Sequence, residues 1–129
     1  MNLLAALVLL LFSSGRWTIP IAAWAAPIFL LRFARGGRAW PRLLAVAAAL
    51  YAAGCVTWWG MVPVPAPGYF FIMLGVLLPT LLPYLAGRLV PRDSGFRGTL
   101  VFPAAWVATE YLISRISPYG TWGLTAYTQ

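Results

Sequence analysis

Two side chains that could do chemistry lie four residues apart in an apolar segment near the end of the chain. Trp106 and Glu110 both fall within residues 99–113, and this spacing places them on one face of a helix. A carboxylate inside an apolar segment is costly, so Glu110 suggests a functional role. The structural alternative is that Glu110 lies at the outer end of the helix and pairs with Arg115 or Arg16.

The segment that follows is rich in aromatic, glycine and hydroxyl-bearing residues. Residues 117–129 include Trp122, Tyr127 and Gln129 and are too irregular for a membrane span. Tyrosine and tryptophan prefer the membrane–water interface, so residues 114–129 are predicted to form an outer interfacial segment. This segment is either a plain interfacial loop or the rim of a cleft for a lipid or acyl chain.

Residues 103–129 carry a motif with a recognisable spacing. It reads Pro-Ala-x-Trp-x-x-x-Glu-[aromatic]-Leu, then a Trp 12 residues after the Glu, then Tyr-Thr-Gln. The residues that carry it are Pro103, Trp106, Glu110, Trp122, Tyr127 and Gln129. This pattern resembles the apolipoprotein N-acyltransferase family, and the order of apolar runs and basic loops before it is also similar.

The resemblance implies a function in lipoprotein synthesis. Members of that family are bacterial plasma-membrane enzymes with a periplasmic nitrilase-like domain that holds a Glu-Lys-Cys triad. The cysteine takes an acyl chain from a phospholipid and passes it to the N-terminal cysteine of a lipoprotein. By this resemblance Trp122, Tyr127 and Gln129 belong to a lipid cleft, and Trp106 and Glu110 order the helix end beneath it.

The catalytic part of such an enzyme is not expected within these residues. The chain contains no lysine, so the triad cannot be assembled, and the motif ends before a nitrilase domain would begin. We therefore expect a truncated N-terminal portion that is inactive by itself and lacks its C-terminal catalytic domain. Cys55 lies in an apolar run without a nearby base and is predicted to serve packing. With one cysteine and no histidine, no metal site or cofactor is predicted.

Some positions depart from the family pattern and leave other functions open. Tyr119-Gly-Thr-Trp122 stands in place of the usual Gly-Phe-Pro-Trp, and Ile113 stands where an arginine is usual. The chain could therefore be the membrane part of a divergent carbon–nitrogen hydrolase. The second alternative is a stand-alone small membrane protein, such as a transporter fragment or an assembly partner, although the sequence has no internal repeat.

The amino-acid composition indicates whether the chain lies in water or in a membrane. Hydrophobic residues make up 62% of the 129 residues and charged residues 9%, whereas soluble domains have about 45–50% and about 25%. A soluble monomer and a disordered chain are therefore excluded. The net charge of +7 comes from nine arginines in short breaks between apolar runs. That distribution predicts a membrane topology signal and no nucleic-acid binding.

The sequence thus predicts an all-α fold, a polytopic transmembrane bundle of about five helices without a soluble domain. A break at Ser14–Arg16 is predicted, because it keeps Arg16 out of the middle of the membrane. Ala45, Ala49 and Ala53 form a stripe of small residues that lets helices pack closely. Pro79 and Pro83 predict a kink in the fourth apolar run. The predicted spans are residues 2–14, 17–31, 43–62, 69–87 and 99–113.

Seven arginines lie in the two loops that are predicted to face the cytoplasm. They are Arg32, Arg35, Arg38, Arg42, Arg88, Arg92 and Arg97. Only Arg16 and Arg115 fall on the other side. The predicted location is the bacterial inner membrane, with residues after 113 outside and with membrane phospholipid and a lipoprotein substrate as the partners that the resemblance implies.

Overall fold

The computed structural model describes residues 2–91 and 94–116, and within these ranges it is entirely helical. The predicted all-α class is confirmed for this part of the chain. The helices are α1 (Asn2–Leu11), the 3-10 helix η1 (Gly15–Trp17), α2 (Pro20–Ala34), α3 (Ala39–Thr57), α4 (Ala66–Thr80), α5 (Leu82–Leu89) and α6 (Gly95–Ile116).

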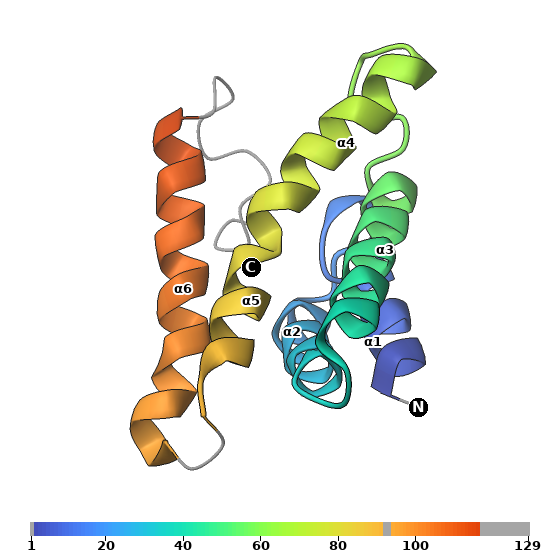
Figure 1. The fold of residues 1–129 in the computed structure, drawn as a ribbon. Coiled ribbons are helices and arrows are strands. Elements are labelled where there is room, and N and C mark those ends of the chain that lie inside the picture. Colours follow the sequence, from blue (N-terminus) through green and yellow to red (C-terminus); the bar gives the residue numbers. More distant parts are fainter. Residues whose placement is uncertain (1, 92–93, 117–129) are drawn as a thin grey trace.

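The helices form two groups that meet at α2 and α5. Figure 1 shows α1, α2 and α3 together on one side and α5 beside α6 on the other, with α4 leaning across toward the end of α3. The turn between α1 and α2 contains Ser14, Gly15 and Arg16, so this stretch breaks into two short helices. Helix α6 packs on α5 and α4 and has no contact of comparable extent with the first group.

Two prolines interrupt the fourth apolar run. Helix α4 ends at Thr80 and α5 begins at Leu82, so the break at Leu81 lies between Pro79 and Pro83. Because proline has no N–H and its ring clashes with the preceding turn, the ladder of helical hydrogen bonds cannot continue unchanged here. The predicted kink is present, and it lets α5 turn to lie along α6 (Figure 1).

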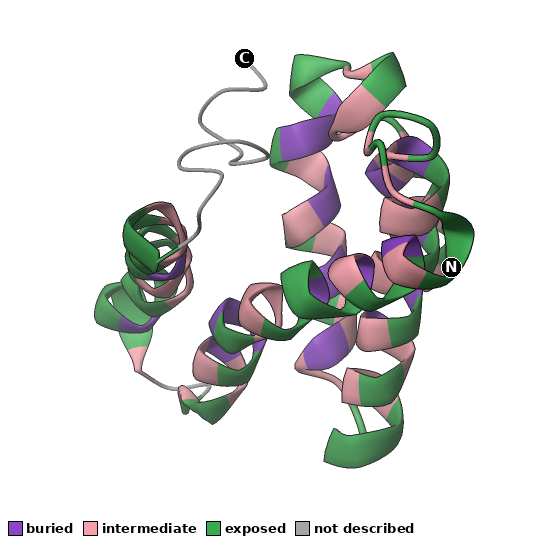
Figure 2. Cartoon of the chain, turned by 90° about the horizontal axis from the view of Figure 1, so that it is seen from above, coloured by how far each residue is buried: buried purple, intermediate pink, exposed green. Residues whose placement is uncertain are grey.

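Small residues dominate the core of the first group. Ala49 and Ala53 of the predicted stripe are buried on α3, where they join buried alanines of α1 and α2. A methyl side chain lets backbones approach closely, which favours helix packing where surrounding lipid is as apolar as the protein. Figure 2 shows the buried residues of the chain as short purple bands among exposed and intermediate ones, and most residues of α6 are exposed.

The C-terminal end of α2 is held by two arginines from other helices. The Nη1 atom of Arg42 donates to the Phe33 carbonyl at 3.0 Å, and the guanidinium lies 4.8 Å from the Phe33 ring centroid. Arg88 on α5 donates to the carbonyls of Ala34 and Gly37, the latter at 2.9 Å. The carbonyls of Phe33 and Ala34 lie in the last turn of α2 and carry the negative end of its dipole, so cations stabilise them, while the bond to Gly37 holds the loop that follows.

Two further helix ends are closed in the same manner. The buried Tyr69 hydroxyl on α4 donates to the Cys55 carbonyl in the last turn of α3 at 2.8 Å. Arg35 donates to the Val90 carbonyl at the end of α5 at 3.4 Å. Each contact joins a helix end to a different element. The hydrogen bonds that cap the helices therefore also hold the helices together.

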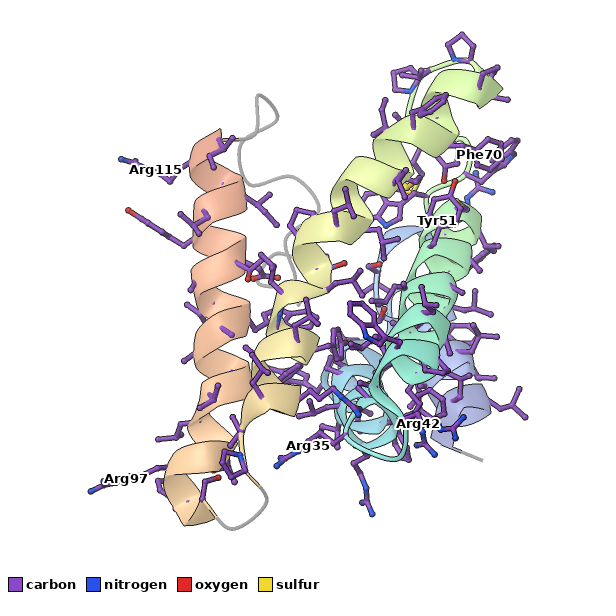
Figure 3. All side chains as sticks on the ribbon, in the orientation of Figure 1. Arg35, Arg42, Tyr51, Phe70, Arg97 and Arg115 are labelled. Carbon is purple, nitrogen blue, oxygen red and sulfur yellow. The ribbon has the colours of Figure 1, made fainter. Side chains whose placement is uncertain are left out.

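The arginines of the two basic loops meet at one end of the molecule. Arg88 binds the segment after α2, so the loops come together, and Figure 3 shows Arg35, Arg42 and Arg97 at that end and Arg115 at the opposite end. The labelled arginines of the two basic loops thus lie at one end of the molecule, and the membrane side that this end faces stays a prediction. Arg92 lies outside the described residues.

Two helical segments within the described part are long and apolar enough to cross a membrane. They are α3 and the run Ala66–Leu89, which comprises α4 and α5. The expectation of about five spans is therefore supported for two segments only. Helix α1 has 10 residues and α2 has 15, fewer than the about 20 that a bilayer requires. Helix α6 has 22 residues but is less apolar, with Arg97 in its first turn.

We expect Arg88→Gln to lower the free energy of unfolding by about 2 kcal/mol, because hydrogen bonds from a charged donor to the end of α2 are lost. The measurement is equilibrium unfolding in detergent micelles, followed by far-UV circular dichroism. Arg97→Gln is the matched control, since exposed Arg97 forms no hydrogen bond or ion pair within the described residues. Equal effects of the two substitutions would contradict the role given to Arg88.

Candidate functional site

The predicted pair Trp106 and Glu110 is joined by a hydrogen bond. The indole Nε1 of Trp106 donates to Oε1 of Glu110 at 3.0 Å, and both residues are half-buried on α6. A neutral donor on a carboxylate forms a charge-assisted bond, which is stronger than one between two neutral groups. The four-residue spacing therefore does what the sequence indicated: it brings the two polar groups to one face of one helix.

An aromatic cluster fixes the ring of Trp106. Its centroid lies 6.0 Å from that of Tyr84 at an interplanar angle of 82°, and 5.6 Å from that of Phe102. Tyr84 and Phe102 are themselves 5.3 Å apart. Edge-to-face rings at these distances attract each other because of their quadrupoles. Glu110 is thus positioned through Trp106, and Trp106 through α5.

Tyr84 is the member of this cluster that the sequence did not single out. Its side chain is fully buried, and its hydroxyl has no hydrogen-bond partner among residues 2–91 and 94–116. A buried polar atom without a partner is rare and calls for an explanation. The signal available in the sequence was weak: a hydroxyl-bearing aromatic next to Pro83 in an apolar run, where only the tertiary structure shows which side chains surround it.

Close approach of α2 and α5 helps to bury Tyr84. Gly87 lies one turn after Tyr84 on the same helix, and a Cβ atom there would be 2.7 Å from Cδ1 of Leu31 on α2. A larger residue here would force the Leu31 side chain to move, so glycine lets the two helices pack closely at this point. Leu30 and Ala34 of α2 belong to the same buried cluster as Tyr84.

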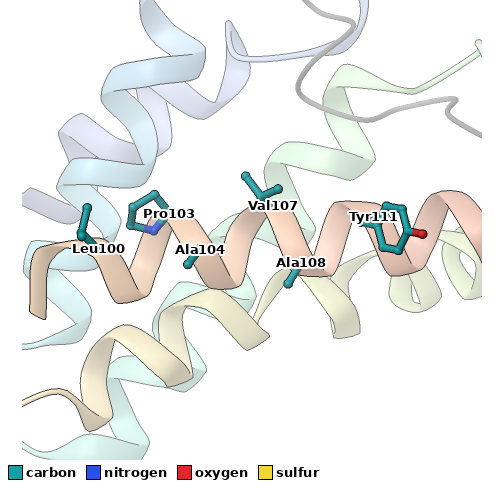
Figure 4. Close-up of a pocket in the computed structure, with 6 residues that line it drawn as sticks. All are labelled: Leu100, Pro103, Ala104, Val107, Ala108 and Tyr111. Carbon is teal, nitrogen blue, oxygen red and sulfur yellow. The ribbon is translucent and has the colours of Figure 1, made fainter. Parts of the chain in front are cut away.

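The opposite face of α6 is an exposed apolar surface with a shallow, widely open hollow. Figure 4 shows its six lining residues, which all belong to α6: Leu100, Pro103, Ala104, Val107, Ala108 and Tyr111. The Tyr111 hydroxyl is the one polar side-chain group among them. The motif residue Pro103 thus lies on this exposed face, whereas Trp106 and Glu110 lie on the face toward α5.

The two arginines considered as partners of Glu110 lie elsewhere. The Arg115 guanidinium lies over the Tyr111 ring, 6.0 Å from its centroid, and Arg16 lines a hollow near Trp59 and Phe70. Neither forms an ion pair with Glu110 in the part of the chain that the structure describes. Glu110 instead accepts the hydrogen bond from Trp106.

Three of the predicted site residues, Trp122, Tyr127 and Gln129, lie outside the described residues. The lipid cleft that they were predicted to line with Trp106 and Glu110 therefore remains a prediction. Cys55 is a free, half-buried thiol on α3. No three side chains of the kinds that bind metals gather among the described residues.

Comparisons with known proteins identify no relative. No family model matches the sequence, and no curated protein and no solved structure is similar to it.

Tyr84→Phe is expected to leave the free energy of unfolding unchanged or to raise it by about 1 kcal/mol, because it removes a buried hydroxyl that lacks a partner. Tyr69→Phe is the matched control: it deletes a hydroxyl that donates to Cys55 and should cost about 1 kcal/mol. Equilibrium unfolding of both variants in detergent checks this pair. Similar losses in both would reveal a partner for Tyr84.

Proposed function

We propose that this chain is the membrane-embedded portion of an enzyme similar to apolipoprotein N-acyltransferase. Its role is to anchor a catalytic domain at the outer leaflet and to shape the cleft through which a phospholipid acyl donor enters. The hydrogen bond from Trp106 to Glu110 carries this proposal, because it joins two motif residues into one rigid unit. The helix end beneath the predicted cleft is thereby ordered, as a positioning role requires.

Membrane embedding is supported by the large exposed apolar surface of the two long segments. Only 17% of the apolar window of α3 is buried, and 28% of that in Ala66–Leu89. A core helix of a water-soluble protein would be largely covered by its neighbours. Large side chains such as Trp24, Trp40 and Phe71 are at least 70% exposed. Apolar surface of this extent is stable when hydrocarbon surrounds it.

The proposed orientation puts the arginine-rich end in the cytoplasm. Arg32, Arg35, Arg38, Arg42, Arg88 and Arg97 belong to this end, and the segment between α3 and α4 has no charge. By the positive-inside rule, that uncharged segment and the end of α6 face outward. The Trp106–Glu110 pair then lies toward the outer side, where the N-terminal cysteine of a lipoprotein is acylated in the family that the motif resembles.

The hollow on α6 suits an acyl chain. Its lining side chains form an apolar, widely open surface along α6, and a hydrocarbon chain gains free energy in proportion to the area that it removes from water. The acyl transfer itself requires a nucleophilic cysteine with a base and a lysine. The chain contains no lysine, so these groups belong to a domain outside these residues.

Single-cysteine labelling tests the orientation. In a Cys55→Ser background, Pro65→Cys is expected to react with a membrane-impermeant maleimide on intact cells, because the turn faces outward. Ala39→Cys, at the start of α3, is expected to react only after lysis. Resistance of the chain to alkaline carbonate extraction shows integration. The reverse labelling pattern, or release by carbonate, would contradict the proposal.

Acyl transfer by the chain alone is expected to stay at background. The assay uses vesicles with a fluorescent phospholipid and a diacylated lipopeptide as acceptor, and turnover above background would refute the assignment of catalysis to another domain. With a nitrilase-like catalytic domain joined after residue 129, Glu110→Gln should lower transfer at least about tenfold, since misplacement by about 1 Å can cost about 100-fold. Arg115→Gln is the control and should leave the rate unchanged.

A further inference from the structure

A second hollow lies at the outer end of α3, away from the site on α6. It has a volume of about 440 Å³ and lies between η1, the last turn of α3 and the first turn of α4. Its lining includes one charged and three aromatic side chains: Arg16, Trp17, Trp59 and Phe70. The hollow therefore combines one cation with three aromatic rings.

A tight turn holds Arg16 in this position. Gly15 has a φ of +80°, and a Cβ atom there would lie 2.6 Å from the Thr57 carbonyl oxygen, so only glycine fits. The Ile19 amide donates to the Phe12 carbonyl at 2.7 Å, and the Thr18 hydroxyl donates to the Gly15 carbonyl at 3.0 Å. These hydrogen bonds close the turn itself, and the close approach of Gly15 to Thr57 places it against the end of α3.

Arg16 differs from the arginines at the other end of the molecule. Arg42 and Arg88 use their guanidinium groups to close the end of α2, whereas Arg16 is exposed and has no hydrogen bond or ion pair within the described residues. The one acidic side chain in that part of the chain is Glu110, which is on α6. The donors of Arg16 are therefore available to an anion from outside.

The aromatic walls indicate what else the anion must carry. Trp17, Trp59 and Phe70 are between 43% and 55% exposed. Trp59 is fixed by an edge-to-face contact with Tyr69 at 5.3 Å, and Phe70 belongs to the first turn of α4, where the Tyr51 hydroxyl donates to its carbonyl at 3.3 Å (Figure 3). An inorganic anion would gain nothing from these rings, whereas an amphiphile would cover them.

We propose that this hollow binds one phospholipid, with its phosphodiester on Arg16 and its glycerol and upper acyl region against Trp59 and Phe70. Guanidinium donors match phosphate oxygens in charge and geometry, and tryptophan favours the depth at which headgroups meet acyl chains. The site is separate from the apolar face of α6 described above. It rests on the membrane placement proposed above, because only an embedded chain presents this end to a lipid headgroup.

The test measures phospholipid binding to the full chain in an uncharged detergent without phosphate. Phosphatidylglycerol is titrated and the one-to-one complex is quantified by native mass spectrometry. Arg16→Gln is expected to raise the dissociation constant at least about tenfold, as loss of a charged hydrogen bond does. Arg115→Gln removes the same charge outside the hollow and should change it less than about twofold. Trp59→Leu should also weaken binding, although it leaves the charge unaltered.

Inorganic phosphate separates a lipid site from a plain anion site. Millimolar phosphate should not displace the phospholipid, and equal binding by free phosphate would overturn the lipid assignment. Equal effects of Arg16→Gln and Arg115→Gln would overturn the role of Arg16. Carbonate extraction of the same variants distinguishes the two proposals. Release of the chain would contradict the proposed membrane embedding. A chain that stays in the membrane and binds phospholipid independently of Arg16 would contradict only the lipid site proposed here.

Discussion

The carbonyl groups at helix ends need donors, and this requirement organises the molecule. The last turn of a helix leaves carbonyl oxygens without intrahelical partners, and those that packing removes from solvent need donors from elsewhere in the chain. Arg42 and Arg88 serve the end of α2, Tyr69 the end of α3 and Arg35 the end of α5. Each donor comes from another element, so satisfying the backbone also connects the helices. Arg88 matters most, because it links the α1–α3 group to α5 and hence to α6.

The same requirement divides the arginines into two kinds. At one end of the molecule, Arg35, Arg42 and Arg88 donate hydrogen bonds to backbone carbonyls. Their donors therefore hold the loops that carry them, whereas their part in membrane topology belongs to the proposal made above. Arg16, at the other end, is held in place by the turn around Gly15 and keeps its donors available. Arg35, Arg42 and Arg88 are therefore structural, whereas Arg16 is suited to binding a ligand.

The region around α6 depends on contacts made by side chains from α5. Trp106 could have adopted several rotamers, but Tyr84 and Phe102 restrict its ring and leave its N–H directed at Glu110. The interruption between Pro79 and Pro83 is what lets α5 lie along α6. A kink in one helix thus sets the position of a carboxylate on another, and the exposed apolar face of α6 remains open on the other side.

Periodicity and composition were sufficient for the local features of this protein. Helix content, the breaks at Ser14–Arg16 and at Leu81, and the shared face of Trp106 and Glu110 follow from spacing, proline chemistry and charge placement, which act over a few residues. Of the about five spans that hydropathy predicted, two segments in the described part of the chain are long and apolar enough to cross a membrane. Helices α1 and α2 have only 10 and 15 residues. The burial of Tyr84, the carbonyls chosen by Arg88 and the hollow around Arg16 join residues that are distant in sequence. Only tertiary packing decided these, because side-chain direction and helix contact are not encoded in any local pattern.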